Sequence, residues 1–232
     1  MTANAIFTIP WRILPKWLVG DRLKILMYHS VSDNPRDPHA IAPDEFTQQM
    51  KILRSKRVVS LREGLDYLRD GCPLRNVYVI TFDDALLDFY TTALPVLREF
   101  GYPVTMFVST GMVAGKAVWD TFDKTKPTMS WKQLEECQGE QVVYGSHTVN
   151  HIRLQECSDA KLADELETSL IYLQKRLDVV IPALAYPGGY HNARVRLAAR
   201  SVGYSCALGA SSRWGNGPES DLFQLRRQSF IV

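Results

Sequence analysis

The fold of this chain is decided by the stretch VYVITFDD, which occupies residues 77–84. An unbroken run of β-branched and aromatic residues is typical of a buried parallel strand. Two carboxylates follow where this strand ends, and charges in such a place are costly unless they bind something. Neighbouring residues of an extended backbone point in different directions, so Asp83 and Asp84 suit two tasks, for example one metal ligand and one base. The alternative is a strand that ends in a solvated turn.

Strands and helices alternate outward from this stretch in both directions. Short apolar runs predict further strands at residues 23–27, 58–59, 103–108, 141–144, 183–186 and 204–208, and an extended segment at 222–232. Apolar residues at helical spacing and N-cap residues predict helices from 43, at 60–69, at 86–100 with Pro95 inside, from 130, at 159–177 and at 192–202. This order is typical of α/β proteins in which helices connect parallel strands. We predict a distorted (β/α) barrel of about seven parallel strands, complete or incomplete, with a doubly wound open sheet as the alternative.

Composition indicates an ordinary soluble globular protein. The chain has 232 residues, of which 46% are hydrophobic and 22% charged, and a formal net charge of +2. So small a charge argues against nucleic acid as the main partner. The four cysteines are scattered, without a C-x-x-C pair, which fits neither a zinc ribbon nor a disulfide scaffold. We expect buried free thiols and a reducing, cytoplasmic location.

The first 22 residues form a separate N-terminal arm, and residues 23–232 form one domain. Residues 6–19 are apolar but are interrupted by Pro10, Arg12, Pro15 and Lys16, so they match neither a signal peptide nor a membrane span. Tryptophans alternate with basic residues here, a pattern that favours contact with a membrane surface. We predict partial partition with anionic liposomes that is lost on deletion of residues 1–19. The alternative is an arm packed on the domain.

Polar residues gather where four of the predicted strands end. They are Tyr28-His29, Asp83-Asp84, His147 with His151, and the turn at residues 186–189. Parallel α/β folds form their sites at the carboxyl ends of the strands. Residues without function would be spread over both ends of a barrel, so we expect these four groups to meet in one site.

Two histidines four residues apart can share a metal ion, because they lie on one face of a helical turn. His147 and His151 have this spacing, although the spacing alone is weak evidence. One carboxylate from a neighbouring strand would complete a set of two histidines and one carboxylate, which leaves open positions as a catalytic zinc site requires. Asp83 and Asp84 supply that ligand and a spare carboxylate, which can take a proton from water.

The motifs TFDD (residues 81–84), HTVNH (147–151) and YPGG (186–189) resemble the three leading motifs of the NodB-type polysaccharide deacetylases, carbohydrate esterase family 4. The resemblance extends from about Ile25 to Gly203. The early stretch MYHSVSD (27–33) is similar to the opening of a branch with circularly permuted motifs, which includes the poly-N-acetylglucosamine deacetylases. The resemblance implies that residues 23–232 are a NodB homology domain with a distorted (β/α) barrel.

The same resemblance implies an activity and a cofactor. The family removes acetyl groups from N-acetylated amino sugars of a polysaccharide or a glycan precursor. It uses Zn²⁺ or another divalent transition metal, such as Co²⁺ or Ni²⁺. By position, Asp84, His147 and His151 would be the metal ligands, and Asp83 would be the general base.

Substrate contacts are implied around the third motif. Tyr186 and Pro187 would wall the groove, and the backbone N–H of Gly188 would help to hold the oxyanion. We also expect Trp119, in a long loop, to stack on a sugar ring, with packing in the loop as the alternative.

Three residues depart from the family pattern. Ala85 stands where the family often has glycine, and Gly188 stands where it usually has an aromatic residue. Ala185 stands in the place of an arginine that usually orients the base, so the partner of Asp83 is unidentified. This departure motivates a second hypothesis, a carbohydrate-binding protein that has lost turnover. A third hypothesis is deacylation of a small or lipid-linked sugar.

The leaving nitrogen of the amide needs a proton, and a histidine suits this task near neutral pH. In the unpermuted family this histidine lies in a late motif, but the chain has no histidine after His191. His29 directly follows the first strand and matches the early motif, so we predict that it is the general acid. His191 is the second candidate, and we expect His39 to be solvated in its loop.

Overall fold

A computed structural model describes residues 21–35, 37–118, 125–139, 141–177, 179, 182–210 and 214–229. Residues 1–20 of the predicted arm and Trp119 lie outside the described residues, so their roles stay predictions. Within the described ranges, no helix is both long enough and apolar enough to cross a bilayer.

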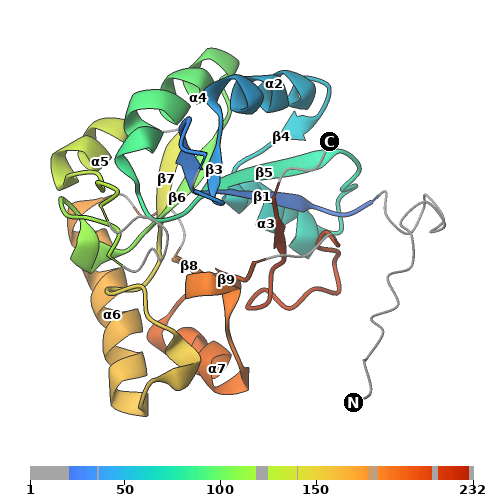
Figure 1. The fold of residues 1–232 in the computed structure, drawn as a ribbon. Coiled ribbons are helices and arrows are strands. Elements are labelled where there is room, and N and C mark those ends of the chain that lie inside the picture. The colour runs from blue at the N-terminus through green and yellow to red at the C-terminus, as the bar shows by residue number, and fades with distance from the viewer. Residues whose placement is uncertain are drawn as a thin grey trace, which may run out of the picture.

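Seven parallel strands form a nearly closed barrel with helices around it (Figure 1). Their order is β10 (Arg227–Gln228), β1 (Lys24–Tyr28), β5 (Val77–Phe82), β6 (Val104–Val108), β7 (Val142–Ser146), β8 (Ala183–Ala185) and β9 (Cys206–Leu208). The short β4 (Arg57–Val58) also pairs with β5. The prediction of a barrel of about seven parallel strands is confirmed, and the doubly wound open sheet is wrong.

The two ends of the domain meet at the first strand. β10 pairs with β1, where Ile25 is opposite Arg227, and the segment before β10 bridges to β9 through Leu225 and Leu208. The C-terminal segment therefore nearly closes the barrel between β1 and β9, and Figure 1 shows it beside β1. A smaller parallel pair, β2 (Ser30–Val31) with β3 (Ala40–Ile41), lies in the connection that follows β1.

The α-helices of the described residues are α2 (Pro43–Leu53), α3 (Leu61–Asp70), α4 (Leu94–Phe100), α5 (Trp131–Cys137), α6 (Asp159–Arg176) and α7 (Ala193–Val202). Four of these six helices, α3, α5, α6 and α7, begin at a side chain that accepts a hydrogen bond from the first turn. The predicted caps are confirmed: Ser60 accepts from Glu63, Ser130 forms a capping box with Gln133, and Asn192 accepts from the backbone of α7.

The helix predicted at residues 86–100 is divided into two parts. A π-helical turn, Phe89–Ala93, comes first, and α4 continues from Leu94. Pro95 therefore lies in the first turn of α4, where its missing N–H and its fixed φ are tolerated. The change of helix type places the proline at a helix start rather than in a helix interior.

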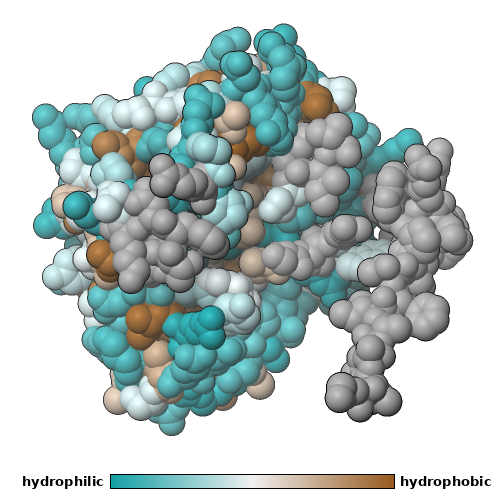
Figure 2. Space-filling model, viewed as in Figure 1, coloured by the Kyte–Doolittle hydropathy of each residue, from teal (hydrophilic) through white to brown (hydrophobic). Residues whose placement is uncertain are grey.

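Apolar side chains fill the barrel and the layer between strands and helices. All five residues of β6 are buried, as a strand covered on both faces requires. On the face in Figure 2, hydrophilic residues cover most of the described surface and hydrophobic residues form small, separate patches. The four cysteines are free thiols, but only Cys137 and Cys206 are buried, which corrects the expectation for the other two.

Candidate active site

The site lies at the carboxyl ends of the barrel strands. Asp83 and Asp84 directly follow β5, His147 directly follows β7, and His29 directly follows β1. Strands β1 and β5 are neighbours, and β6 separates β5 from β7. Parallel pairing brings these ends to one rim, so residues far apart in the sequence converge.

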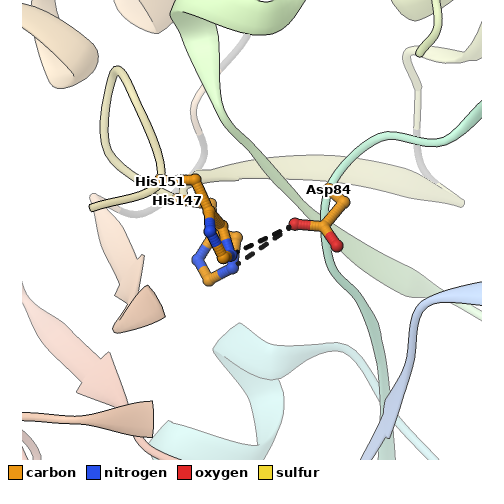
Figure 3. Close-up of side chains that lie close together, drawn as sticks. All are labelled: Asp84, His147 and His151. Carbon is orange, nitrogen blue, oxygen red and sulfur yellow. Dashed lines mark ion pairs between the residues drawn. The ribbon is translucent and has the colours of Figure 1, made fainter. Parts of the chain in front are cut away.

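Asp84, His147 and His151 form a cluster that could hold a metal ion. Their ligand atoms all lie within 4.8 Å of one another. The Oδ1 atom of Asp84 is 3.6 Å from Nε2 of His147 and 3.5 Å from Nε2 of His151 (Figure 3). This oxygen is buried and has no hydrogen-bond partner among the described residues. A buried acceptor without a donor, facing two imidazole nitrogens, fits a cation held by one oxygen and two nitrogens.

His147 is held in one tautomer. Its Nδ1 lies 2.8 Å from the carbonyl oxygen of Ala185, and a carbonyl only accepts, so Nδ1 carries the proton. The lone pair of Nε2 therefore faces Asp84, as a metal ligand requires. Burial, which outweighs the charge of Asp83, lowers the pKa of His147 to about 4, so the imidazole is neutral at pH 7.

The loop that carries both histidines is tied to α6 by one carboxylate. Glu165 is fully buried, and its Oε2 accepts from the backbone N–H groups of Val149 and Asn150, both at 2.9 Å. Its Oε1 accepts from the side-chain amide of Asn150 at 2.6 Å. Burial alone would raise the pKa of Glu165, but the hydrogen bonds from Asn150 outweigh burial and lower this pKa. The sequence analysis missed this residue, although its position three residues after Leu162 places it on the apolar face of the helix.

Asp83 is held by an arginine from the last strand. Two parallel hydrogen bonds join Arg227 to Asp83, from Nη1 to Oδ1 at 2.6 Å and from Nη2 to Oδ2 at 2.7 Å. Arg227 also donates from Nε to the carbonyl of Gly209 at 2.8 Å, and both side chains of the ion pair are buried. Burial raises the pKa of Asp83, but the charges of Arg227 and His147 outweigh burial and hold this pKa well below its usual range. Asp83 is therefore ionised and fixed in direction.

Of the two candidate acids, His29 is the one that lies beside Asp83 in the part of the chain that the structure describes. Its Nε2 lies 3.9 Å from Oδ2 of Asp83. His191 instead contacts Arg196 through Nδ1 at 3.3 Å and packs on the ring of Tyr186. Burial and the charge of Arg196 lower the pKa of His191. His39 is exposed, as expected, but its ring packs against that of His29 with centroids 5.0 Å apart.

Residues 70–207, more than half of the chain, match the family model described as polysaccharide deacetylase. The chain belongs to the polysaccharide deacetylase family. This confirms the family predicted from the three motifs, which all lie inside the matched region.

Relatives of known sequence or structure agree. A poly-beta-1,6-N-acetyl-D-glucosamine N-deacetylase of Staphylococcus aureus is 29% identical over 182 residues, which cover 73% of this chain and 61% of that protein. The Streptococcus pyogenes deacetylase PplD, solved in complex with acetate, is 26% identical with a TM-score of 0.78, over 91% of this chain and 93% of that chain. IcaB from Ammonifex degensii is 27% identical with a TM-score of 0.79, over 92% and 93%. The chain thus spans about three fifths of the staphylococcal relative.

The backbone explains why polysaccharide deacetylases often have glycine after the Asp pair. Asp84 and Ala85 have φ angles of 73° and 51°, in the left-handed region that glycine adopts without strain. Thr148 and His151, in the other ligand motif, have φ angles of 67° and 51°. Non-glycine residues in this region cost on the order of 1–3 kcal/mol each, and such strain clusters at functional sites. Both ligand motifs are therefore held in strained turns by the surrounding structure.

Arg227 provides the guanidinium that is missing from the third motif of this chain. Ala185, in the place of the usual arginine, is a buried residue of β8 and contributes only its carbonyl, which accepts from His147. The guanidinium that faces Asp83 arrives instead from β10. The sequence predicted only an extended segment here, because nothing local to residues 222–232 indicates which strand they join.

The YPGG turn presents its backbone rather than its aromatic ring. Tyr186 is fully buried, and its hydroxyl donates to the carbonyl of Phe223 at 3.1 Å. For the Tyr186 side chain this corrects the prediction that it walls the groove. Pro187 is buried as well, and Gly188 is exposed with φ 62°. A Cβ at Gly188 would come within 2.8 Å of the Tyr190 ring, so glycine avoids this close contact as well as the strain of a positive φ.

Proposed function

We propose that this chain is a metal-dependent hydrolase that removes acetyl groups from N-acetylated amino sugars of a polysaccharide or glycan precursor. One observation carries the proposal: a carboxylate and two histidines that suit a metal ion lie beside a second carboxylate, Asp83, which is ionised and clamped by Arg227. A protein that only binds metal has no need of that second carboxylate.

Asp84, His147 and His151 would hold the metal ion. Two imidazole nitrogens and one carboxylate oxygen are a donor set that catalytic zinc sites use, and Co²⁺ and Ni²⁺ accept the same ligands. When bound, the ion would polarise the attacking water and the amide carbonyl as a Lewis acid.

Asp83 is the general base of the proposed mechanism. Its low pKa keeps it ionised at neutral pH, so it can accept a proton from the attacking water. The two hydrogen bonds from Arg227 hold the carboxylate plane in place, so that little reorganisation is needed at the moment of proton transfer.

His29 is the proposed general acid. When the C–N bond breaks, the sugar nitrogen would leave as a very poor anion unless a proton is delivered to it. His29 follows β1, which pairs with β5 on the side away from β6. It lies at the same rim as Asp83 and is partly open to solvent. The exposed turn at Gly188 offers a backbone N–H for the charge that develops on the carbonyl oxygen.

The hypothesis of an impaired binding protein loses its motive. It rested on the missing arginine at Ala185, and Arg227 occupies the corresponding role opposite Asp83. The name of the staphylococcal relative suggests a β-1,6-linked N-acetylglucosamine polymer as the substrate to try first.

Acetate release from a panel of N-acetylated saccharides tests the proposal. Metal-free protein should be inactive, and addition of Zn²⁺, Co²⁺ or Ni²⁺ should restore acetate release from at least one amino-sugar oligomer. Failure of fully metal-loaded, folded protein to release acetate from every acetylated saccharide would overturn the proposed activity.

A further inference from the structure

A cavity of about 200 Å³ opens directly beside His29, at the carboxyl end of β1. Its lining includes His29, Pro38, His39, Glu45, Gln49 and Ser229. These residues come from the connection after β1, from the first turns of α2 and from the end of β10. The cavity therefore adjoins the acid–base side of the site rather than the metal ligands.

The floor of the cavity is a fixed chain of hydrogen bonds. The hydroxyl of Tyr28 donates to Oε1 of Gln49 at 2.8 Å, and Nε2 of Gln49 donates to Oε1 of Glu45 at 3.3 Å. Gln49 is buried, whereas Glu45 is exposed at the start of α2. The chain orients the Glu45 carboxylate, which still has acceptor capacity for a ligand.

The turn that carries His39, another lining residue, is also held by polar contacts. The backbone N–H of His39 donates to Oδ1 of Asp37 at 2.9 Å, and Asp37 forms a buried ion pair with Lys126 at 2.5 Å. This turn holds the His39 ring against His29. Because these hydrogen bonds and this ion pair already hold the lining side chains in place, little further ordering would be needed for a ligand to bind.

The place of the cavity indicates which part of a substrate enters it. His29 is the proposed donor to the amide nitrogen, and that nitrogen stays with the sugar. In the proposed mechanism the space beside His29 would therefore face the saccharide, and the acetyl group would lie toward Asp84 and the histidines. Pockets for drug-sized ligands usually measure roughly 300–1,000 Å³, so a smaller cavity suits a single ring.

The geometry points to a saccharide subsite in this cavity, in which the Glu45 carboxylate accepts hydrogen bonds from the hydroxyl groups of the sugar unit next to the one that loses its acetyl group. The inference rests on the proposed deacetylase function and deepens it. It makes the preferred substrate an oligomer or polymer rather than a free monosaccharide. Glu45 is thus a specificity-determining residue, and Gln49 is the residue that positions it.

A comparison of substrate lengths tests this subsite. For the metal-loaded protein, kcat/KM for acetate release is measured on N-acetylglucosamine and on its β-linked oligomers of two to five units. We expect the disaccharide to exceed the monosaccharide clearly, and Glu45→Ala to lower this ratio about tenfold, the scale of one hydrogen bond to a charged group. Glu45→Gln, which keeps an acceptor oxygen, should lie between the two proteins.

Asp44→Ala is the matched control. Asp44 is the neighbouring exposed carboxylate in the same first turn of α2, and it does not line the cavity. The control removes the same charge at the same helix end, so it separates loss of a ligand contact from loss of helix stabilisation. It should keep the wild-type length preference.

The outcomes separate the subsite from the activity. A wild-type protein that deacetylates monosaccharide and oligomers equally well, or a Glu45→Ala protein with an unchanged ratio, would overturn the subsite and leave the activity standing. If no saccharide releases acetate, the proposed activity fails, and calorimetric titration of the disaccharide into wild type and Glu45→Ala reports on the subsite alone. Equal affinities in that titration would also overturn it.

Discussion

The two halves of the site are assembled in different ways. The metal half, Asp84 with His147 and His151, comes from two strand ends inside the matched family region of residues 70–207. The acid–base half comes from both ends of the domain, because His29 follows β1 and Arg227 lies in β10, and both lie outside that region. The two halves meet at the adjacent residues Asp83 and Asp84.

This difference shows that the acid–base half of the site depends on closure of the barrel, whereas the metal half does not. The metal half needs only the neighbouring strands β5 to β7 in register. The acid–base half also needs β10 to pair with β1, since that pairing places Arg227 opposite Ile25 and within reach of Asp83. Substitutions in the acid–base half should therefore leave metal binding intact, and substitutions in the metal half should leave the ion pair of Asp83 with Arg227 intact.

Removal of the metal half should have the largest effect. In the double variant His147→Ala/His151→Ala, two of the three ligands are lost, so we expect metal content near zero and acetate release at the level of a blank. Elemental analysis and the acetate assay check this, with His191→Ala as a histidine control that keeps its metal. A stoichiometry near one ion per chain in the double variant would exclude this site.

Removal of the general base should lower turnover without affecting metal binding. Asp83→Asn should retain the metal ion and lose about 10²–10⁴-fold in kcat, the range that a general base contributes. Measurement of metal content and kcat on the same preparation checks both parts. A nearly normal rate would show that another group takes the proton from water.

Weakening the hydrogen bonds from Arg227 to Asp83 should give a smaller loss of kcat, again with the metal ion retained. Arg227→Lys keeps a positive charge but loses the paired hydrogen bonds, and partners of catalytic groups typically contribute about 10–100-fold. Because Arg227 lowers the pKa of Asp83, the acidic limb of the pH–rate profile should move to higher pH. Arg226→Lys, at the exposed neighbouring position, is the control, and an unmoved acidic limb in Arg227→Lys would refute the role of the clamp.

Loss of the acid should cost at least about tenfold in turnover, toward the range expected for such a group, with the metal ion retained. The comparison is His29→Ala against His191→Ala in the acetate assay. We expect His191→Ala to stay near wild type, because His191 contacts Arg196 and Tyr186. The reverse pattern would move the assignment to His191.

The two halves of the site should lose their contributions to folding stability in different pH ranges. In metal-free protein the folded state keeps His147 neutral down to about pH 4, whereas the unfolded chain protonates it near pH 6.5. The unfolded state binds more protons between these values, so stability is complete above about pH 6.5 and falls as the pH drops to about 4. The pKa of Asp84, raised by burial, opposes this trend, so the net loss is smaller than His147 alone would give.

Urea denaturation across that range measures the slope, and His147→Ala should flatten it. The ion pair of Asp83 with Arg227 behaves differently, because the pKa of Asp83 lies below its usual range. Its contribution is present above about pH 4 and is lost only as the pH falls further. A steep loss of stability between pH 6.5 and 4 that persists in His147→Ala would contradict this assignment.

Local patterns were sufficient for the elements and for most of the chemistry. The run that ends in Asp83-Asp84, the spacing of His147 and His151, and the caps at Ser60, Ser130 and Asn192 were all visible in the sequence. The strand run and the caps depend on neighbours within a few residues, the range over which local patterns act. His147 and His151 do converge, but residues 147–151 form an irregular loop rather than the expected helical turn. Pro95 was misplaced because a π-helical turn, which has no clear local pattern, precedes α4.

By itself, the sequence determined the family, the order of strands and helices, the metal-ligand candidates and the candidate base. Only the tertiary structure decided which groups hold them: Arg227 on Asp83, Glu165 beneath the histidine loop, and His39 against His29. The physical reason is that these contacts join elements distant in the chain. Their register follows from strand pairing and barrel closure, so a buried charge finds its partner only after the whole barrel has formed.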